Sequence, residues 1–566
     1  MEREELENLR IERLDHLGIV AGICREIGLA EYLDARDAQS HERVGIGAAT
    51  VAMILNGLGF ANRRLYLVSQ FFATKPVEHL VGAGIHAEDL NDECLGRALD
   101  WLYAHDPTLL FAGIAAQARR RLGVSARQLH VDTTSFSVSG EYTFEEGEVD
   151  AEAMAITYGY SRDRRQDLKQ WMLALATTGE GAIPVFLRPL DGNASDQREL
   201  ATTIESLVKQ LREAGEEGGI EDGGIEDGGI EEGGIEEGGI YVADGGVYSE
   251  ANRRHFAAVG VRWISRVPET SREAKALLRD EPSDWERSAD GTTHFFTRQM
   301  DLPPGMERWI VVVTQAGRER TRATLSRRAQ QDQERWERQL WHLGHQDFAC
   351  QADAEAELAR QLKTLPSWLQ VTSQVRERPH YASKGRPAKQ AQPLRQSWRL
   401  QATVRRDEEQ LEREVERRAR FIVATNVLDP QELSDEEAIR TYKAQSTVER
   451  GFAFLKDPLF LASSVFLKKP ERIMALSLVM VLCLLVYRLA EWRLRQALTR
   501  TEQTVPNQLR QPTDRPTMRW IFECFEGIHL VMIRGPGGTQ TRVHGLKPLH
   551  LQVLALLGPD VTKMYT

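Results

Sequence analysis

Between Gln128 and Val267 short apolar runs alternate with amphipathic stretches, and this order restricts the fold more than any other feature. Three apolar runs come first: LHVDTTSFSV, WMLALATT and IPVFLRPL. An amphipathic stretch, the run IYVAD, a second amphipathic stretch and the run VRWISRV follow. Short apolar runs rich in β-branched and aromatic residues predict strands, and amphipathic stretches predict helices. This order is typical of a mixed α/β sheet.

The sequence on either side of this pattern has a different character. The first 125 residues read as helical, with Asp106 and Pro107 placed to cap and open an apolar helix. A charged stretch with some β-rich runs interrupts the pattern after Val267, and the apolar run FIVATN resumes it. We therefore expect an all-helical region, a first part of the sheet, an insertion, a second part of the sheet and a small appendage. Their boundaries are 1–125, 126–268, 269–419, 420–492 and 493–566.

An acidic repeat lies inside the first part of the sheet. GGI recurs with a period of five, and the segment from Glu216 to Glu237 holds ten acidic residues and no basic one. Paired glycines at this period oppose both helix and strand. We expect residues 215–240 to form a solvated loop. The array also accounts for most of the formal net charge of −11, so the overall charge does not identify a partner.

Cysteine use and hydropathy predict a cytoplasmic protein that does not enter a membrane. The five cysteines are far apart and form no C-x-x-C pair, which argues against a disulfide framework or a cysteine-rich zinc site. The charged N-terminus lacks the apolar core of a signal peptide. The uncharged run from Ile473 to Tyr487 is short for a span of about 20 residues, so we expect a buried core helix there.

Two aspartates, Asp132 and Asp244, end the first and fourth predicted strands. A charged side chain in such a sheet costs several kcal/mol unless it is paired or binds a metal. If the two strands are neighbours, both carboxylates point into one crevice. Taken singly, an aspartate at a strand end is more often a turn residue.

A third group of polar residues lies in the stretch 434–457, which is predicted to be one helix. Four of them fall within a wedge of about 60° on one helix face. These are Tyr442, Gln445, Glu449 and Lys456. The adjoining apolar stripe, formed by Val448, Phe452 and Leu455, would pack on the sheet. An ordinary polar edge of an amphipathic helix is the alternative explanation.

Taken in order, LHVDTTSF, YVADGGVYSEANRRHF and YKAQSTVERGFAFLK resemble the three acidic motifs of bacterial DDE insertion-sequence transposases. More narrowly, they resemble the branch with a Y-x2-R-x3-E-x6-K signature. Tyr442, Glu449 and Lys456 match that signature in register, whereas Gln445 stands where the arginine is expected. The resemblance implies a ribonuclease H-like mixed sheet with flanking helices, interrupted by a β-containing insertion. It also implies that the helical N-terminal region binds transposon ends or pairs protomers.

The resemblance implies a role for each of these residues. Asp132, Asp244 and Glu449 would bind two Mg²⁺ ions, for which Mn²⁺ can substitute, and the ions would drive phosphodiester cleavage and transfer. Tyr442, Gln445 and Lys456 would contact DNA near the cut. Tyr248 matches a D-x-x-x-Y pattern after Asp244 and would also contact DNA.

A second predicted DNA contact lies in the basic segment 375–406, where nine Lys or Arg residues accompany the single acid Glu377. Such a local excess of positive charge is typical of a phosphate-backbone footprint. Its KGRP sequence is similar to a minor-groove hook. The candidate contacts are Lys384, Arg386 and Lys389. A solvated loop is an equally good explanation.

The expected function is that of a bacterial DNA transposase that cuts at terminal inverted repeats and transfers the strands to target DNA. It would work as a homodimer on double-stranded DNA in the cytoplasm, at the nucleoid when bound. Two alternatives stay open: a ribonuclease H-like nuclease that cuts without joining, and a DNA-binding protein derived from a dead element.

Overall fold

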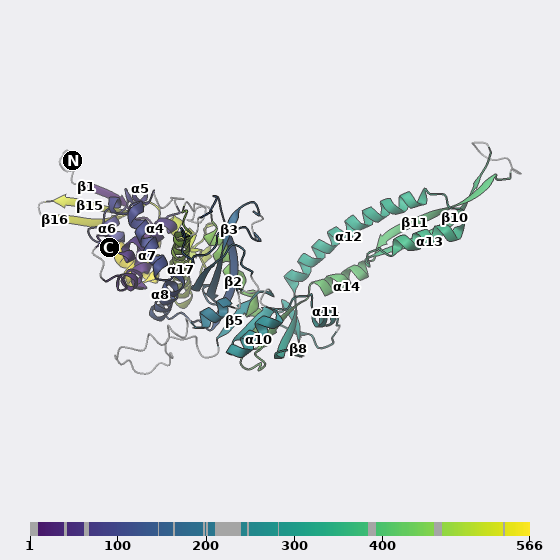
Figure 1. Ribbon diagram of the computed structural model, residues 1–566, viewed down its shortest axis with the longest axis horizontal. Coiled ribbons are helices and arrows are strands. Elements are labelled where there is room, and N and C mark those ends of the chain that lie inside the picture. Colours follow the sequence, from purple (N-terminus) through teal and green to yellow (C-terminus); the bar gives the residue numbers. More distant parts are fainter. Residues whose placement is uncertain are drawn as a thin grey trace.

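The structure is a computed structural model with a body and a long arm (Figure 1). The described residues are 9–38, 42–60, 67–144, 147–161, 165–195, 199, 202–209, 239–245, 248–280, 282–382, 392–457, 467–535 and 538–566. The acidic repeat and the predicted DNA contacts Lys384, Arg386 and Lys389 lie outside them.

A nine-stranded mixed sheet forms the centre of the body. Its strand order is β4-β3-β2-β5-β6-β12-β9-β8-β7. β2, β5 and β6 are parallel to one another, and every other neighbouring pair is antiparallel. The strands are β2 (Gln128–Val138), β3 (Lys169–Thr178), β4 (Pro184–Leu190), β5 (Ile240–Ala243), β6 (Arg262–Arg266), β7 (Glu286–Arg287), β8 (Thr293–Leu302), β9 (Gly305–Thr314) and β12 (Phe421–Thr425). The mixed α/β sheet predicted from the order of apolar runs is therefore present.

The sheet extends into the stretch expected to be an insertion. β9 pairs with β12 from Phe421↔Val312 to Thr425↔Arg308, and β8 pairs with β9. The run from Trp309 to Val313 is buried, so it is part of the same core as the strands before it. Among the described residues of this stretch, 315–382 and 392–418 leave the body. They form the arm, from α12 (Gln315–Gly344), α13 (Gln351–Leu362), β10 (Leu369–His380), β11 (Arg395–Arg406) and α14 (Glu408–Arg418).

Helices cover both faces of the sheet. One face carries α15 (Asp435–Lys443), α16 (Ser446–Leu455) and α17 (Pro470–Arg500). Ile439 of α15 packs with Val242, and Val448 of α16 packs with Leu175. The other face carries α10 (Glu250–Val259) and α11 (Arg272–Arg279), which pack on the alternate residues of the same strands.

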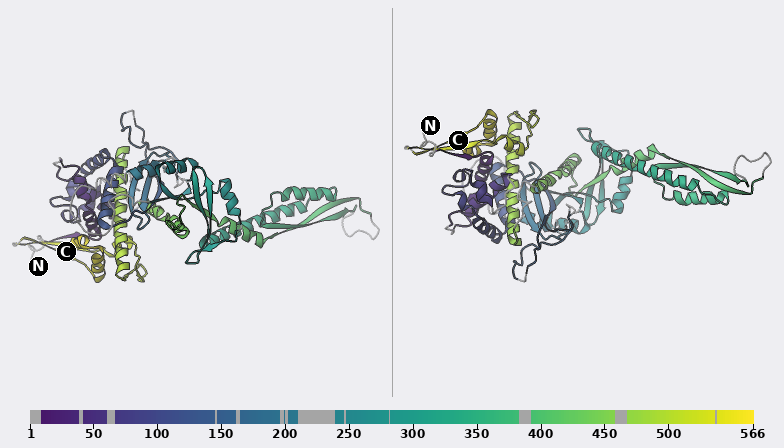
Figure 2. Two further views of the ribbon diagram at one scale, coloured as in Figure 1. Left: turned by 90° about the horizontal axis from the view of Figure 1, so that it is seen from below. Right: turned by 90° about the horizontal axis from the view of Figure 1, so that it is seen from above.

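The long apolar helix α17 lies between the sheet and the N-terminal helices (Figure 2). It is the one helix among the described residues that is long enough and apolar enough to cross a membrane. However, 89% of its most apolar 18-residue window is buried inside the protein. The prediction of a buried core helix at Ile473–Tyr487 is confirmed.

Seven α-helices form most of the described part of the N-terminal region, as expected. They are α2 (Leu17–Glu26), α3 (Leu29–Asp34), α4 (Ile46–Leu58), α5 (Val68–Phe72), α6 (Val77–Leu80), α7 (Asp92–Ala104) and α8 (Pro107–Leu122). Asp106 caps α8 as predicted, because its Oδ1 accepts from the Thr108 N–H at 2.8 Å.

One strand departs from the all-helical character expected there. β1 (Leu9–Arg13) pairs with β15 (His529–Gly535), which pairs with β16 (Gly538–His544). The C-terminal residues are not a separate appendage, since α20 (Pro559–Thr562) packs on α2 and the Tyr565 hydroxyl donates to the Asp15 carbonyl at 2.6 Å. The two terminal regions form one unit.

Candidate active site

Asp132 and Asp244 lie side by side on neighbouring strands. β2 and β5 are parallel, and Val131↔Ala243 is the last pair between them, so each aspartate comes one residue later. The expectation that the first and fourth predicted strands are neighbours is confirmed. Asp132 is half-buried and its Oδ1 accepts from the Thr133 N–H at 2.8 Å, whereas Asp244 is exposed.

Both carboxylates belong to the face of the sheet covered by α15 and α16. Asp132 is directly opposite Leu175 in the antiparallel β2–β3 pair, and opposite residues share a face. Leu175 packs with the apolar residues of α16. Asp244 follows Val242 by two residues, and Val242 packs with α15. Since side chains alternate along a strand, Asp244 is on the same face.

Tyr442 connects α15 to this edge of the sheet. Its hydroxyl donates to Asp244 Oδ1 at 3.3 Å. Burial of the phenol and the neighbouring negative charge of Asp244 raise the pKa of Tyr442 to about 12. Tyr442 therefore stays protonated at neutral pH and remains a donor to the carboxylate.

The predicted single helix over 434–457 is wrong, because the chain breaks into α15 and α16. The Gln445 N–H bonds to the Tyr442 carbonyl at 3.1 Å, and the Val448 N–H bonds to the Gln445 carbonyl at 3.0 Å. These tight i−3 bonds interrupt the α-helical repeat at residues 444–445. The four polar residues consequently do not share one helix face. Gln445 is 8% exposed, and its Oε1 has no hydrogen-bond partner among the described residues.

Glu449 and Lys456 are at opposite ends of α16, which crosses β2 and β3. Glu449 is in the first turn and is exposed. Lys456 follows the last turn, and its Nζ is 5.6 Å from the centroid of the Phe136 ring on β2. A Cβ on Gly451 would lie 3.8 Å from Leu175, the residue opposite Asp132. The helix thus places Glu449 above the same face as the two aspartates.

The residues suit a divalent cation by chemistry and partly by placement. All three acidic candidates offer carboxylate oxygens, which Mg²⁺ prefers. No group of three His, Cys, Asp or Glu side chains within the described ranges is already close enough together to hold a metal. Asp132 and Asp244 supply two adjacent ligand positions, and Glu449 must turn inward from its exposed position to complete the set.

Arg266 is a residue of this site that the sequence reasoning missed. It ends β6, one residue after the pair Ala243↔Ser265, and is therefore beside Asp244. Its guanidinium carbon is 5.5 Å from the centroid of the Phe421 ring, and the rings of Phe421 and Tyr442 are 6.1 Å apart. Its side chain also pairs with Glu269 at 3.2 Å. The available signal was a charged residue ending the strand that follows Asp244.

Tyr248 has surroundings different from those expected of a DNA contact. It packs on the opposite face of the sheet, with Trp263 and Trp309. Its hydroxyl donates to the buried Glu307, which also accepts from the Trp309 indole at 2.8 Å and pairs with Arg253. Burial and Glu307 raise the pKa of Tyr248 above its ordinary value. We therefore correct this assignment: Tyr248 belongs to an interior cluster, where its hydroxyl is occupied.

Comparison with known proteins adds two family matches. The family described as Transposase DDE domain matches residues 126–486, and the family described as Domain of unknown function (DUF4277) matches residues 9–116. No curated protein matches the chain. Among solved structures, a similar one is the cryo-EM structure of the piggyBac transposase synaptic complex with hairpin DNA. It has 9% identity and a TM-score of 0.24, over 83% of this chain and 80% of that one.

Proposed function

The chain belongs to the family of transposases with a DDE domain, so it is a DNA transposase, and we propose that Asp132, Asp244 and Glu449 are its catalytic acids. The reaction proposed for them is cleavage at the inverted repeats that end an insertion sequence, followed by transfer of the cut strands to target DNA.

The observation that carries this assignment is the parallel pairing of β2 with β5. It brings Asp132 and Asp244 to the same edge and the same face of the sheet. The hydrogen bond from Tyr442 to Asp244 and the packing of α16 over β2 support the inclusion of the third acid.

We propose Mg²⁺ as the metal, with Mn²⁺ as a substitute, because the candidate ligands are carboxylates. When bound, two such ions activate the attacking water or 3′-hydroxyl and stabilise the leaving oxygen. Asp244 directly follows the end of β5, whereas Asp132 is inside β2 and does not end its strand as the sequence pattern predicted. The two would supply adjacent ligand positions. Tyr442 orients the Asp244 carboxylate by its hydrogen bond, and the phenol keeps its proton at neutral pH.

Cationic side chains near the acids would bind the phosphates of the cut strand. Lys456 reaches β2 from the end of α16, and Arg266 is beside Asp244. Gln445 lacks the charge of the arginine in the family signature, so we propose that Arg266 supplies a guanidinium to this site. Joining two ends requires two active sites, which supports a homodimer on paired inverted repeats in the bacterial cytoplasm.

The experiment that tests the function is a plasmid assay with paired ends, taken from the DNA on either side of the reading frame. The unchanged protein should release the segment and join it to a second plasmid in Mg²⁺ but not in EDTA. Asp244→Asn should abolish cleavage and keep end binding. Asp167→Asn is the control, because Asp167 is an exposed acid paired with Arg165 at 2.8 Å.

Each other outcome has a defined meaning. Cutting without joined products identifies a nuclease, and end binding without cutting by the unchanged protein identifies a DNA-binding derivative. Cleavage by Asp244→Asn at the rate of Asp167→Asn overturns the site assignment.

A further inference from the structure

The arm rises from the sheet edge that carries the candidate active site. α12 starts directly after Thr314, the last residue of β9, and α14 ends shortly before Phe421, the first residue of β12. Phe421 pairs with Val312, and Val423 pairs with Arg266, so both connections are at the edge where Asp244 lies. The arm then extends away from the body (Figure 1). A duplex cut at this edge therefore has the arm alongside it.

The distal part of the arm is a two-stranded ribbon, β10–β11, with one covered face and one open face. Val371, Val375, Leu400 and Val404 form the covered face and pack with the helices of the arm. The alternate residues form the outer face. Its exposed members include Thr372, Gln374, Arg376, Gln401, Thr403 and Arg405, and the partly buried Arg399, opposite Arg376, is on the same face.

The outer face is positive and polar. Thr372 is opposite Thr403, and Gln374 is opposite Gln401, so like residues form cross-strand rows. Glu377 is the single acid in the two strands, and the period of two puts it on the other face. Asp347 lies beside this face and pairs with Arg399 and Arg378, whereas Arg376 and Arg405 are exposed, so the face keeps an excess of positive charge that is complementary to a polyanion.

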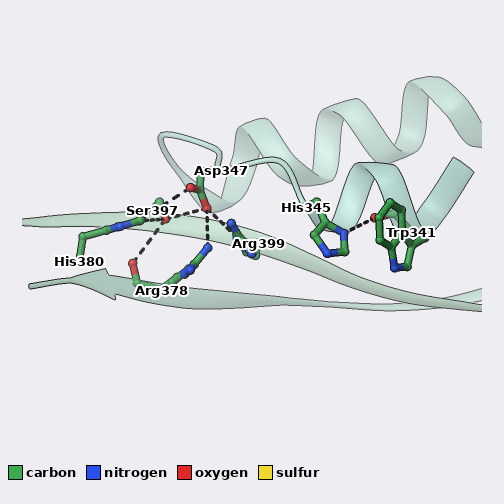
Figure 3. A network of polar contacts seen from close by, with 7 residues as sticks. All are labelled: Trp341, His345, Asp347, Arg378, His380, Ser397 and Arg399. Carbon is green, nitrogen blue, oxygen red and sulfur yellow. Dashed lines mark hydrogen bonds and ion pairs between the residues drawn. The ribbon is translucent and has the colours of Figure 1, made fainter. Parts of the chain in front are cut away.

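The turn between α12 and α13 holds the ribbon through residues of the same outer face (Figure 3). Asp347, in the turn between α12 and α13, accepts from Arg399 Nε at 2.7 Å and from the Ser397 hydroxyl at 3.2 Å. His380 Nε2 is 2.7 Å from that hydroxyl. The backbone of Phe348 also pairs with Trp398 in both directions. These contacts fix the outer face before any partner arrives, which lowers the entropy cost of binding.

We propose that the outer face of β10–β11 enters the major groove of the DNA end and reads its bases. The inference rests on the proposed function, because it assigns the partner of the arm to the DNA that the site cuts. A two-stranded ribbon fits the major groove. Glutamine pairs with adenine, arginine with guanine, and the threonine methyl contacts the thymine methyl. These are the residue types that the outer face presents.

The length of the arm sets where the contact falls. α14 has 11 residues, and Arg399, opposite Arg376, is seven residues before the end of β11. At 1.5 Å per helical residue and 3.3 Å per strand residue, the outer face from Arg405 to Arg376 lies about 20–40 Å from the sheet edge. For DNA that follows the arm, this is about 6–12 base pairs from the cut, or close to one helical turn.

The test uses the full chain and duplexes made from the DNA on either side of its reading frame, with binding measured in EDTA. Gln374→Ala with Gln401→Ala should weaken binding to these ends about 10- to 100-fold relative to unrelated duplex. Arg376→Ala should weaken binding both to these ends and to unrelated duplex. The controls are Gln330→Ala with Gln331→Ala, and Arg320→Ala, on the exposed surface of α12. Guanine N7 methylation about 6–12 base pairs from the cut should interfere with the unchanged protein but not with a variant that carries both Arg376→Ala and Arg405→Ala, because arginine is the residue that contacts guanine N7.

The outcomes separate the ribbon from the function. If the unchanged protein neither binds nor cuts these ends, the proposed function fails. If it cuts them while the ribbon variants bind with full preference and an unchanged methylation pattern, the ribbon proposal alone is overturned. It is also overturned if the variants lose self-association and keep their base preference, because the face is then a protein interface.

Discussion

The Tyr442 hydroxyl donates to Asp244 Oδ1 across 3.3 Å, although 198 positions separate the two residues. The bond joins the last turn of α15 to the end of β5, where a candidate metal ligand lies. It makes the orientation of that carboxylate dependent on α15, which the turn at residues 444–445 connects to α16 and Glu449. Geometry at this edge is therefore shared between strand ends and helices.

Tyr442→Phe should lower the cleavage rate about 10-fold at limiting Mg²⁺, because the variant loses a charge-assisted bond of about 1.5–3 kcal/mol to Asp244. The ring remains to pack against Phe421. The pKa of Tyr442 is about 12, so the ratio of variant to unchanged rate should stay constant from pH 6 to 9. A Mg²⁺ titration of cleavage rate measures this. Equal rates at every Mg²⁺ concentration would contradict the role of the bond.

Arg266→Gln should lower the cleavage rate about 10- to 100-fold, because the proposed contact with a DNA phosphate is lost. The unfolding midpoint should not change, because the Arg266 side chain is partly exposed. Arg262→Gln is the matched control, because Arg262 is on the same strand but pairs with Glu432 at 2.9 Å. Adding Gln445→Arg to Arg266→Gln should restore part of the rate by returning a guanidinium to the site. If both single variants cleave alike, Arg266 has no part in the reaction.

Gly451→Ala should raise the free energy of unfolding by about 0.5–1 kcal/mol, because alanine favours the helix over glycine. The added Cβ would lie 3.4 Å from Leu484 Cδ2 and 3.8 Å from Leu175 Cδ2, which are ordinary contacts. Gly451→Leu has no room between those side chains and should lower the stability and the cleavage rate together. Denaturant unfolding of the two variants gives the comparison. A destabilised alanine variant would mean that α16 packs closer to the sheet.

His130 should make the protein less stable as the pH falls from about 6.5 to 4. Its imidazole is buried, and burial lowers its pKa from 6.5 to about 4. Between these two pH values His130 is protonated in the unfolded chain but neutral in the folded chain, so acid favours unfolding. The stability is full above pH 6.5, and about 2 kcal/mol is lost by pH 5. His130→Leu should remove this part of the loss and keep the stability at pH 7.5, because neither ring nitrogen has a hydrogen-bond partner among the described residues. Unfolding midpoints at pH 7.5 and 5 test it, and an unchanged difference would contradict the prediction.

Local patterns were enough to predict the strands before the arm, the buried helix α17 and the placement of Asp132 and Asp244. In each case the periodicity or the order of the runs carries the information. The break at residues 444–445 could not be predicted this way, since Ala444 and Gln445 are both good helix formers. Packing on the sheet overrides that preference.

Other features depend on contacts between distant parts of the chain. Nothing in the local sequence of β8 and β9 says that they join the same sheet as β12, because pairing partners are not encoded in a single run. The spacing of Tyr248 from Asp244 likewise does not decide which face of the sheet the tyrosine meets. Its partner Glu307 comes 59 residues later.

The pairing of β1 with β15 has a consequence during synthesis. Leu9 meets Ile533, and Gly18 and Gly22 pack closely against Tyr565 and Val561. The first helices to leave the ribosome therefore lack these packing partners until the sheet, the arm and the C-terminal residues have been translated. A truncated product, even one with all three candidate acids, would leave the apolar surface of its first helices uncovered. We therefore expect a prematurely released chain to be degraded by proteases before it binds DNA.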